Sequence, residues 1–319
     1  MGYKAASLAS ITTGYNTLFL RGLRAMTSAT AYQSFAAEFT VTDPTTVFPI
    51  QGRAPKMREW VGPRTVRDTK VYGYSLTAKL FEATQKVRRQ DVEDDKYGLY
   101  DGLMEGLGES AGRLPFDQVV AAVIAGTSNT CYDGEYFFDT DHPQDPSGAI
   151  STTYANEYGS LPLTASNAAL VRSYMELRKD EEGQILGVAP NAVMIPTTLR
   201  KTAEEIFRGA TIIQAQTNAA GTENVGAAAP TNVMQGTFSI IVVPELDASS
   251  TSTWYMLDTR MQLKPFFWEW RIRPTFSRIT SEDSEYVMSK DEYLFGARAR
   301  GAAGYGLPQL ASRCQSTSL

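Results

Sequence analysis

The chain contains a single histidine, His142, in an acidic run that could support metal binding or acid–base catalysis. The run is Asp139-Thr140-Asp141-His142. Imidazole is the commonest general acid or base, and zinc accepts imidazole, carboxylate and thiolate ligands, the last available from Cys131. A catalytic zinc site normally needs three protein ligands, and here the others would have to be carboxylates or Cys131. Acid–base catalysis by one histidine also needs a nucleophile or an oxyanion donor, and the sequence indicates neither. We therefore favour a turn whose side chains bond the local backbone, and the alternative is a metal- or carboxylate-dependent hydrolase using Asp139, Asp141 and His142.

The segment Gly108-Glu109-Ser110-Ala111-Gly112 matches the nucleophile-elbow pattern GxSxG. That chemistry requires a buried strand before the serine and a helix after it. The preceding residues, Tyr100 to Leu107, have helical spacing instead. We interpret these small residues as the place where a helix packs closely against a neighbour.

Asp91, Glu93 and Asp95 alternate as they do at the start of a calcium-binding loop. Lys96 and Gly102 then occupy the positions that require Gly and Glu, so the pattern fails. Negative charge near a helix N-terminus explains these acids better. The sequence also has no phosphate-binding loop, CxxC or dinucleotide fingerprint. We expect no catalytic residue, no metal and no cofactor, and therefore a protein that is not an enzyme.

Aromatic residues gather in one short segment, 266–270. Strand alternation places Phe266, Trp268 and Trp270 on one face, and Phe267 and Glu269 on the other. Such a cluster could stack on sugars or bases. We favour a strand that buries aromatic residues in a core or a subunit interface.

The composition is that of an ordinary globular protein of 319 residues, with 43% hydrophobic and 20% charged residues. A net charge of −5 gives no support for a free-standing nucleic-acid binder. The two cysteines, Cys131 and Cys314, are too few for a disulfide framework and predict reduced thiols. No apolar run approaches the ~18 residues that cross a bilayer, and we expect neither a signal peptide nor a membrane partner.

Charge and periodicity single out residues 53–90. This stretch carries ten Lys or Arg against three Asp or Glu. Apolar residues alternate with polar ones from Tyr72 to Leu80, which predicts a long strand with one buried face. Gly62-Pro63 is a turn signal, so the arms around it can pair as an extended hairpin. A basic hairpin on an acidic chain predicts that its counter-surface is the acidic body of another copy.

Helical spacing predicts helices from Ile11 to Met26, from Leu99 to Gly126 with a break or kink near Pro115, from Thr164 to Lys179, and from Thr197 to Gly209. The third of these carries Leu170, Tyr174 and Leu177 on its apolar face. Strands are predicted at 192–195, 238–243, 254–257, 265–273 and 286–300, and an extended, loop-like segment at 40–49. This mixture without regular βαβ order indicates an α+β fold.

Three blocks carry a family resemblance: MREWVG (57–62), KLFEATQKVRRQDVEDD (79–95) and CYDGEYFFDTDHP (131–143). In their order and spacing they resemble the major head subunit family of Mu-like phages and prophages. That family is similar to the tailed-phage major capsid proteins with the Hong Kong 97 fold. The resemblance implies that the chain self-assembles into the icosahedral shell that encloses a phage genome.

The same resemblance implies a domain plan. Residues 1–52 would be an N-terminal arm and residues 53–90 the extended loop, a β-hairpin that lies across a neighbouring subunit. Residues 91–163 and 271–319 would form the peripheral domain with its spine helix, and residues 164–270 the axial domain.

Partners and assembly residues follow as expectations. The chain would form hexamers and pentamers of itself, would meet scaffold, portal and decoration proteins, and would contact packaged double-stranded DNA only non-specifically. It would be made in the bacterial host cytoplasm and reside in the virion capsid. Residues expected at inter-subunit contacts are Arg58, Glu59, Trp60, Arg64, Arg67, Lys70, Lys79, Lys86, Arg88 and Arg89.

Overall fold

The computed structural model describes residues 5–51, 59, 71–94, 98–148, 151–211, 216–217, 223–224 and 231–316. The chain divides into two compact units. The first comprises Met1–Val47, Ser75–Ala121 and Phe267–Gly304, and the second comprises Phe48–Tyr74, Ala122–Phe266 and Tyr305–Leu319. Each unit contains helices and a sheet, as the predicted α+β class requires.

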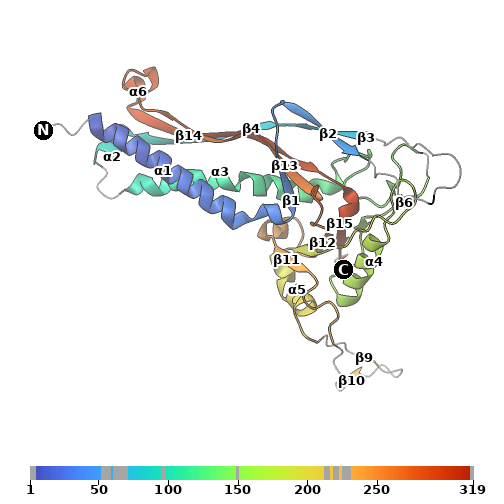
Figure 1. Cartoon of the computed structure of the whole chain (residues 1–319). Coiled ribbons are helices and arrows are strands. Elements are labelled where there is room, and N and C mark those ends of the chain that lie inside the picture. Colours follow the sequence, from blue (N-terminus) through green and yellow to red (C-terminus); the bar gives the residue numbers. More distant parts are fainter. Residues whose placement is uncertain are drawn as a thin grey trace. The chain divides into compact units, whose positions relative to one another are not determined.

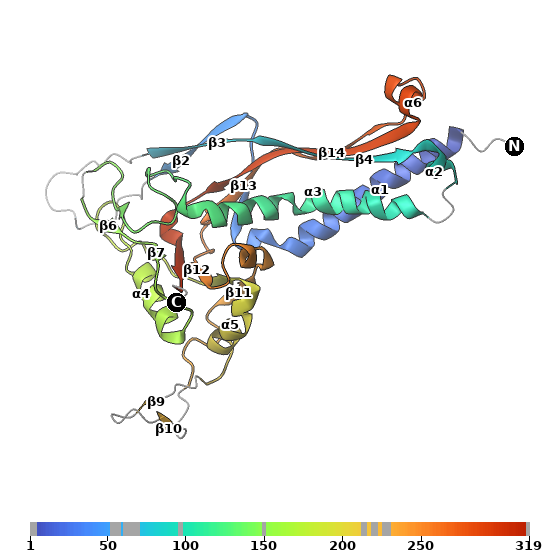
Figure 2. The ribbon, with the colours of Figure 1, turned by 180° about the vertical axis from the view of Figure 1, so that it is seen from behind.

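In the first unit, two long helices lie along one side of a four-stranded sheet (Figures 1 and 2). The helices are α1 (Ala5–Thr30) and α3 (Leu99–Ile124). The sheet has the order β1 (Ala36–Thr40), β13 (Phe266–Ile279), β14 (Glu292–Tyr305) and β4 (Lys79–Arg88). Aromatic rings join the layers: Tyr15 meets Phe295 edge-on, and Phe19 lies against Phe276, each at 5.2 Å between centroids. These contacts bury the N-terminal helix against its own unit.

Glycines let α1 and α3 approach closely. A Cβ atom added to Gly108 would collide with the Phe19 carbonyl, and one on Gly112 would lie 2.6 Å from the Leu23 carbonyl oxygen. Gly22 of α1 meets the Glu105 carbonyl in the same way. Small residues at a helix crossing allow backbone-to-backbone packing. The interpretation of GxSxG as a packing motif is confirmed.

Of the break or kink predicted near Pro115, the break is wrong, because the helix α3 continues through that residue. Proline removes the hydrogen bond to the Ala111 carbonyl. The flanking turn is held by packing instead, because Phe116 is buried against Phe35 and Val119 is fully buried. The predicted apolar stripe is also displaced: Leu103 is 47% exposed, and the buried face passes through Met104 and the glycines.

The strand predicted from Tyr72 to Leu80 changes phase at Ala78. Even-numbered residues of β3 (Val71–Thr77) are the more buried ones, as predicted. The Ala78 amide then donates to the Pro44 carbonyl at 3.1 Å, outside either strand. In β4 the odd-numbered residues turn inward, with Phe81 near Trp268 at 6.3 Å. Leu80 is therefore 59% exposed, and its predicted burial is wrong.

The second unit is built on a five-stranded mixed sheet. Its order is β11 (Ser239–Val242), β8 (Ala192–Ile195), β12 (Thr253–Leu257), β15 (Ala311–Gln315) and β7 (Glu157–Tyr158). β11 runs parallel to β8 and β7 runs parallel to β15, whereas β12 is antiparallel to both of its neighbours. The strands predicted at 192–195, 238–243 and 254–257 are confirmed.

Two helices of this unit, α4 (Ala165–Glu176) and α5 (Arg200–Phe207), contribute to one core cluster with the sheet. Val193 and Trp254 supply the sheet side of that core, and Phe207 supplies part of the helix side. The Thr164 hydroxyl caps α4 by accepting from the Asn167 amide at 3.2 Å. The opposite face of the sheet meets other aromatic residues, since Tyr255 lies 5.5 Å from the Phe138 ring.

The inward face of α4 differs from the predicted one. Ala168, Val171 and Met175 are fully buried. The three large residues of the predicted apolar face point outward: Leu170 is 38%, Tyr174 43% and Leu177 62% exposed. The helix therefore has two apolar faces, and only the one with smaller residues serves its own core.

Shorter elements complete the fold. The segment 40–49 was expected to be loop-like but enters β2 (Thr45–Gln51), and 286–300 begins as α6 (Glu285–Lys290) before β14. The aromatic segment 266–270 is buried on both faces as part of β13. The described residues include no helix long and apolar enough to cross a membrane. The remaining elements are α2 (Arg89–Asp94), β5 (His142–Pro143), β6 (Thr153–Tyr154), β9 (Gln216–Thr217), β10 (Glu223–Asn224) and the 3-10 turns at Tyr32–Ser34, Ala125–Thr127, Thr197–Leu199, Pro244–Ala248 and Pro308–Leu310.

The two units divide the chain differently from the predicted domains. The second unit contains residues 164–266 of the predicted axial domain and also residues 122–163, which were expected in the peripheral domain. The assignment of axial and peripheral roles stays a prediction.

Candidate functional site: assembly surfaces and a buried polar cluster

The base of the predicted hairpin is a two-stranded sheet. β2 pairs with β3, so the arms on either side of the Gly62-Pro63 turn signal lie together where the structure describes them. The return arm then continues as β4, which pairs with β14 over ten residues, from Lys79 opposite Gly301 to Arg88 opposite Glu292. Residues 79–88 are thus an edge strand of the first unit's sheet, and they anchor the hairpin to it.

The ten residues expected at subunit contacts differ in their surroundings. Lys86 pairs with Glu292 at 3.1 Å, and Arg89 pairs with Glu282 at 2.7 Å, so each meets an acid of its own chain. Glu59, Lys79 and Arg88 are exposed. The other expected assembly residues, Arg58, Trp60, Arg64, Arg67 and Lys70, lie outside the described residues. The contribution of all ten to subunit contacts stays a prediction.

A groove of about 820 Å³ opens beside the outward face of α4 in the second unit. Its apolar wall comes from Tyr158, Leu161, Leu170, Tyr174 and Leu177. Tyr158 and Tyr174 face each other at 5.5 Å between ring centroids. Exposed apolar residues that adjoin one another are typical of interaction surfaces.

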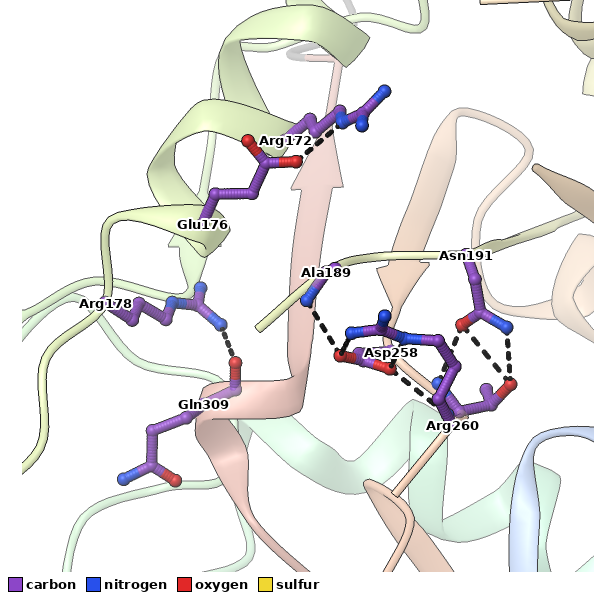
Figure 3. A network of polar contacts seen from close by, with 9 residues as sticks. Arg172, Glu176, Arg178, Ala189, Asn191, Asp258, Arg260 and Gln309 are labelled. Carbon is purple, nitrogen blue, oxygen red and sulfur yellow. Dashed lines mark hydrogen bonds and ion pairs between the residues drawn. The ribbon is translucent and has the colours of Figure 1, made fainter. Parts of the chain in front are cut away.

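Arg178 lines the same groove but is itself 4% exposed. Figure 3 shows its guanidinium on the Gln309 carbonyl, at 2.5 Å. It also donates to the Ala311 carbonyl at 3.0 Å and to the Ser312 hydroxyl at 2.7 Å. Burial lowers the pKa of Arg178. Because these acceptors lie around the start of β15, the buried Arg178 side chain holds its own part of the groove wall against that strand.

Asp258 organises a second network at the end of β12, also drawn in Figure 3. This fully buried carboxylate accepts from the Ala189 amide at 2.8 Å and from two Arg260 nitrogens at 2.9 and 3.0 Å. Burial alone would raise its pKa, but the bonds from Arg260 and the backbone lower it. Asn191 holds the next residue by accepting from the Thr259 amide at 2.8 Å. These bonds hold the segment that leads into β8 against the end of β12.

The single histidine belongs to a buried cluster that the sequence did not indicate. His142 Nδ1 lies 2.8 Å from Asp133 Oδ2, and the two side chains are 0% and 1% exposed. Asp133 Oδ1 accepts from the Cys131 thiol at 2.9 Å and from the Glu135 amide at 3.2 Å. The imidazole stacks on the Tyr154 ring at 5.1 Å and 15°. The expected bond from a side chain of this run to local backbone occurs at Asp139, whose Oδ1 accepts from the Thr140 amide at 2.7 Å. His142 instead meets Asp133, which the turn at 131–135 brings to it.

The predicted partners of the histidine form a separate group. Asp139 and Asp141 lie near Glu135, with one oxygen of each within 4.8 Å of the others. A hydrogen bond that the protonated Asp141 carboxyl donates to Asp139 raises the pKa of Asp141. His142 is fully buried, so a substrate cannot reach the imidazole. The geometry thus gives no support for a hydrolase that uses Asp139, Asp141 and His142.

Comparison with known families shows which family the chain belongs to. The chain matches the family described as "Mu-like prophage major head subunit gpT" over residues 8–162, 157–246 and 230–318. The chain belongs to this family. The resemblance read from the three sequence blocks is therefore confirmed.

Curated relatives of this head subunit agree along nearly the whole chain. One is the Mu-like prophage FluMu major head subunit of Haemophilus influenzae, with 26% identity over 93% of this chain and 70% of the relative. Another is the major capsid protein of Escherichia phage Mu, with 25% identity over 96% of this chain and 72% of the relative.

Solved structures extend the likeness to the fold. The procapsid of bacteriophage JBD30 has a chain with 28% identity and a TM-score of 0.55, covering 99% of the head subunit described here and 77% of that chain. A chain in the capsid of cyanophage P-SCSP1u has 12% identity and a TM-score of 0.57, covering 90% and 88%. The head subunit therefore has the fold of tailed-phage capsid proteins.

Two residues central to this description, Asp133 and Arg178, were not indicated by sequence reasoning. Asp133 lies nine positions before His142, and only the Asp133-Gly134 turn signal hinted that the chain reverses there. Arg178 stands at the end of a helical pattern, where cations are common and usually solvated. Burial by a distant segment such as 308–312 cannot be deduced from local spacing.

Proposed function

We propose that this head subunit assembles with copies of itself into the icosahedral shell that encloses the genome of a tailed phage. The observation that carries the proposal is the family match along almost the whole chain. The fold it shares with chains of solved capsids supports the same conclusion. The virion capsid is then its final location, after synthesis in the host cytoplasm.

The hairpin supplies one inter-subunit contact in this proposal. An isolated two-stranded hairpin is marginal in water, so it gains order by lying on a neighbour. Its proximal cations Lys86 and Arg89 already meet Glu292 and Glu282 of their own chain. The attraction to an acidic neighbour therefore comes from the distal cations Arg58, Arg64, Arg67 and Lys70, together with Lys79 and Arg88; Glu59 and Trp60 complete the contact.

The outward face of α4 supplies an apolar contact. Leu170, Tyr174 and Leu177 line the groove beside a wall that Arg178 fixes. Burial of apolar surface contributes about 25 cal/mol per Å², and a shell repeats each contact in every subunit. Hexamers and pentamers of the chain would bury this face against adjacent copies. Scaffold, portal and decoration proteins are further partners, packaged DNA is contacted non-specifically, and assembly uses no catalytic residue.

Charge reversal in the hairpin tests the electrostatic contact. The variant with Arg58, Arg64, Arg67 and Lys70 all changed to Glu should remain folded by circular dichroism. It should lose large particles in size-exclusion chromatography and negative-stain microscopy. A single exposed ion pair is worth only about 0–1 kcal/mol, so four changes are combined. Raised salt should partly restore assembly by screening the repulsion.

The matched control changes Arg58, Arg64 and Arg67 to Lys, which keeps the charge but removes the guanidinium. This control should still form particles. Normal assembly of the Glu variant at low salt would overturn the electrostatic contact. Failure of the wild-type chain to form any shell or capsomer would overturn the proposed function itself.

A further inference from the structure

We propose that Cys131, Asp133 and His142 form a structural binding site for one zinc ion in the second unit. The site goes beyond shell assembly, and its formation does not depend on that role. It also revises the sequence-based expectation of no metal, which rested on the lack of a third ligand near His142.

The three donor groups converge although they come from separate segments. Their ligand atoms all lie within 4.8 Å of one another. Cys131 and Asp133 come from the turn that the Thr130–Tyr136 bridge closes, and His142 comes from β5. Cys131 is 7% exposed and the other two side chains are at most 1% exposed. An ion among the three atoms would replace the hydrogen bonds between them, because each donor atom would lie at 2.0–2.3 Å from the zinc.

One nitrogen of the cluster is left without a hydrogen bond. His142 meets Asp133 through Nδ1, and its buried Nε2 has no hydrogen-bond partner among the described residues. A divalent ion with one thiolate, one carboxylate and one neutral imidazole brings the net charge to zero.

The donor types select the ion. Sulfur and imidazole nitrogen favour zinc over calcium or magnesium, which prefer all-oxygen sites. Three protein ligands leave one position of a tetrahedral site for water. Binding requires the Cys131 thiolate, so it releases the thiol proton. Because the site is buried, the ion would hold the 131–143 block together and would not meet a substrate.

Cobalt(II) is the probe, because zinc has a filled d shell and no absorption of its own. The full chain is treated with a chelator, dialysed and titrated with cobalt(II). One equivalent should produce the near-ultraviolet band of a thiolate bound to cobalt, and zinc should displace it. Cys131→Ser should abolish the band, and Asp133→Asn and His142→Ala should weaken affinity by at least about tenfold.

Cys314→Ser is the matched control, because Cys314 is also fully buried and belongs to no group of metal ligands among the described residues. This variant should bind cobalt like the wild type. Zinc should also raise the thermal unfolding temperature of the wild type and of Cys314→Ser, but not of Cys131→Ser. Metal-free circular dichroism and melting of each variant separate lost binding from lost folding.

Absence of the band in folded wild-type protein would overturn the proposal, and so would a band that persists in Cys131→Ser or disappears in Cys314→Ser. Particle formation reports on the proposed function independently. Shells without cobalt binding would contradict only the metal site, and cobalt binding without shells would contradict only the assembly role.

Discussion

The α1–α3 crossing and the helix α4 show two ways in which a shell subunit divides its apolar residues. At the crossing, Gly22, Gly108 and Gly112 face inward, while the larger Leu103 of α3 is 47% exposed. On α4 Ala168, Val171 and Met175 face the core, and the Leu170–Tyr174–Leu177 side faces outward. In both helices some large apolar residues therefore remain exposed outside the core of their own unit.

The inward-facing residues of these helices provide the contacts that stabilise a single subunit. Gly108 allows backbone atoms to meet across the helix crossing, and Met175 fills a core that is already closed by the sheet. The outward leucines contribute little to the isolated fold. Their exposure is what the proposed contact between copies of the chain requires.

The largest effect on the stability of the subunit is expected in the core that α4 covers. Met175→Ala removes a fully buried side chain and leaves a cavity, so it should lower the free energy of unfolding by about 2–5 kcal/mol. Thermal or urea unfolding of the purified subunit measures this. A change below about 0.5 kcal/mol would show that α4 does not depend on this face.

The next effect compares two glycines of α3. Gly108→Ala should destabilise by about 1–3 kcal/mol, because the added methyl group collides with the Phe19 carbonyl. Gly106→Ala, two residues earlier, meets nothing within 4 Å and should stabilise the helix by about 0.8–1.0 kcal/mol. Unfolding curves of both variants check the contrast. Equal effects of the same sign would contradict close packing at Gly108.

Much of the fold could be predicted from the sequence. The strands 192–195 and 254–257 are short, fully buried apolar runs, and three blocks within residues 57–143 resembled a known family. The inward faces of α3 and α4 could not be predicted, because periodicity weights large apolar residues and takes no account of glycine packing. Asp133 was missed for a different reason, since its partner His142 is reached only through the tertiary turn of residues 131–136.

A smaller effect on the monomer is expected from the outward face of α4. Leu177→Ser should change the stability of the isolated subunit by no more than about 0.5 kcal/mol, because Leu177 is 62% exposed. The same substitution should slow or reduce particle formation, measured by light scattering. If it destabilises the monomer as much as Met175→Ala, the two faces do not have separate roles.

The smallest effect on stability is expected from Glu269, a buried carboxylate of the first unit. Asp258, a buried carboxylate of the second unit, is fully hydrogen-bonded by comparison. Glu269 is fully buried, and neither of its oxygens has a hydrogen bond of normal geometry within the described residues. Burial raises its pKa, and the Thr46 hydroxyl acts in the opposite direction. A raised pKa in the folded state means that stability is full below the unfolded pKa and is lost as pH rises through the folded pKa.

Glu269→Gln removes this ionisation. The variant should melt at a higher temperature than the wild type near neutral pH, and the difference should shrink toward about pH 4.5, close to the ordinary carboxyl pKa. Melting curves at both pH values measure it. A difference that does not change with pH would show that Glu269 is not ionised at a cost to stability.

Cryo-electron microscopy of the particles formed by the purified chain tests the central claim most directly. The account predicts closed icosahedral shells of hexamers and pentamers, in which each hairpin lies on a neighbouring subunit and the Leu170–Tyr174–Leu177 face is covered by another copy. Shells in which the hairpin touches only its own chain and the α4 face remains open to solvent would contradict it, as would a chain that stays monomeric at every concentration and salt condition.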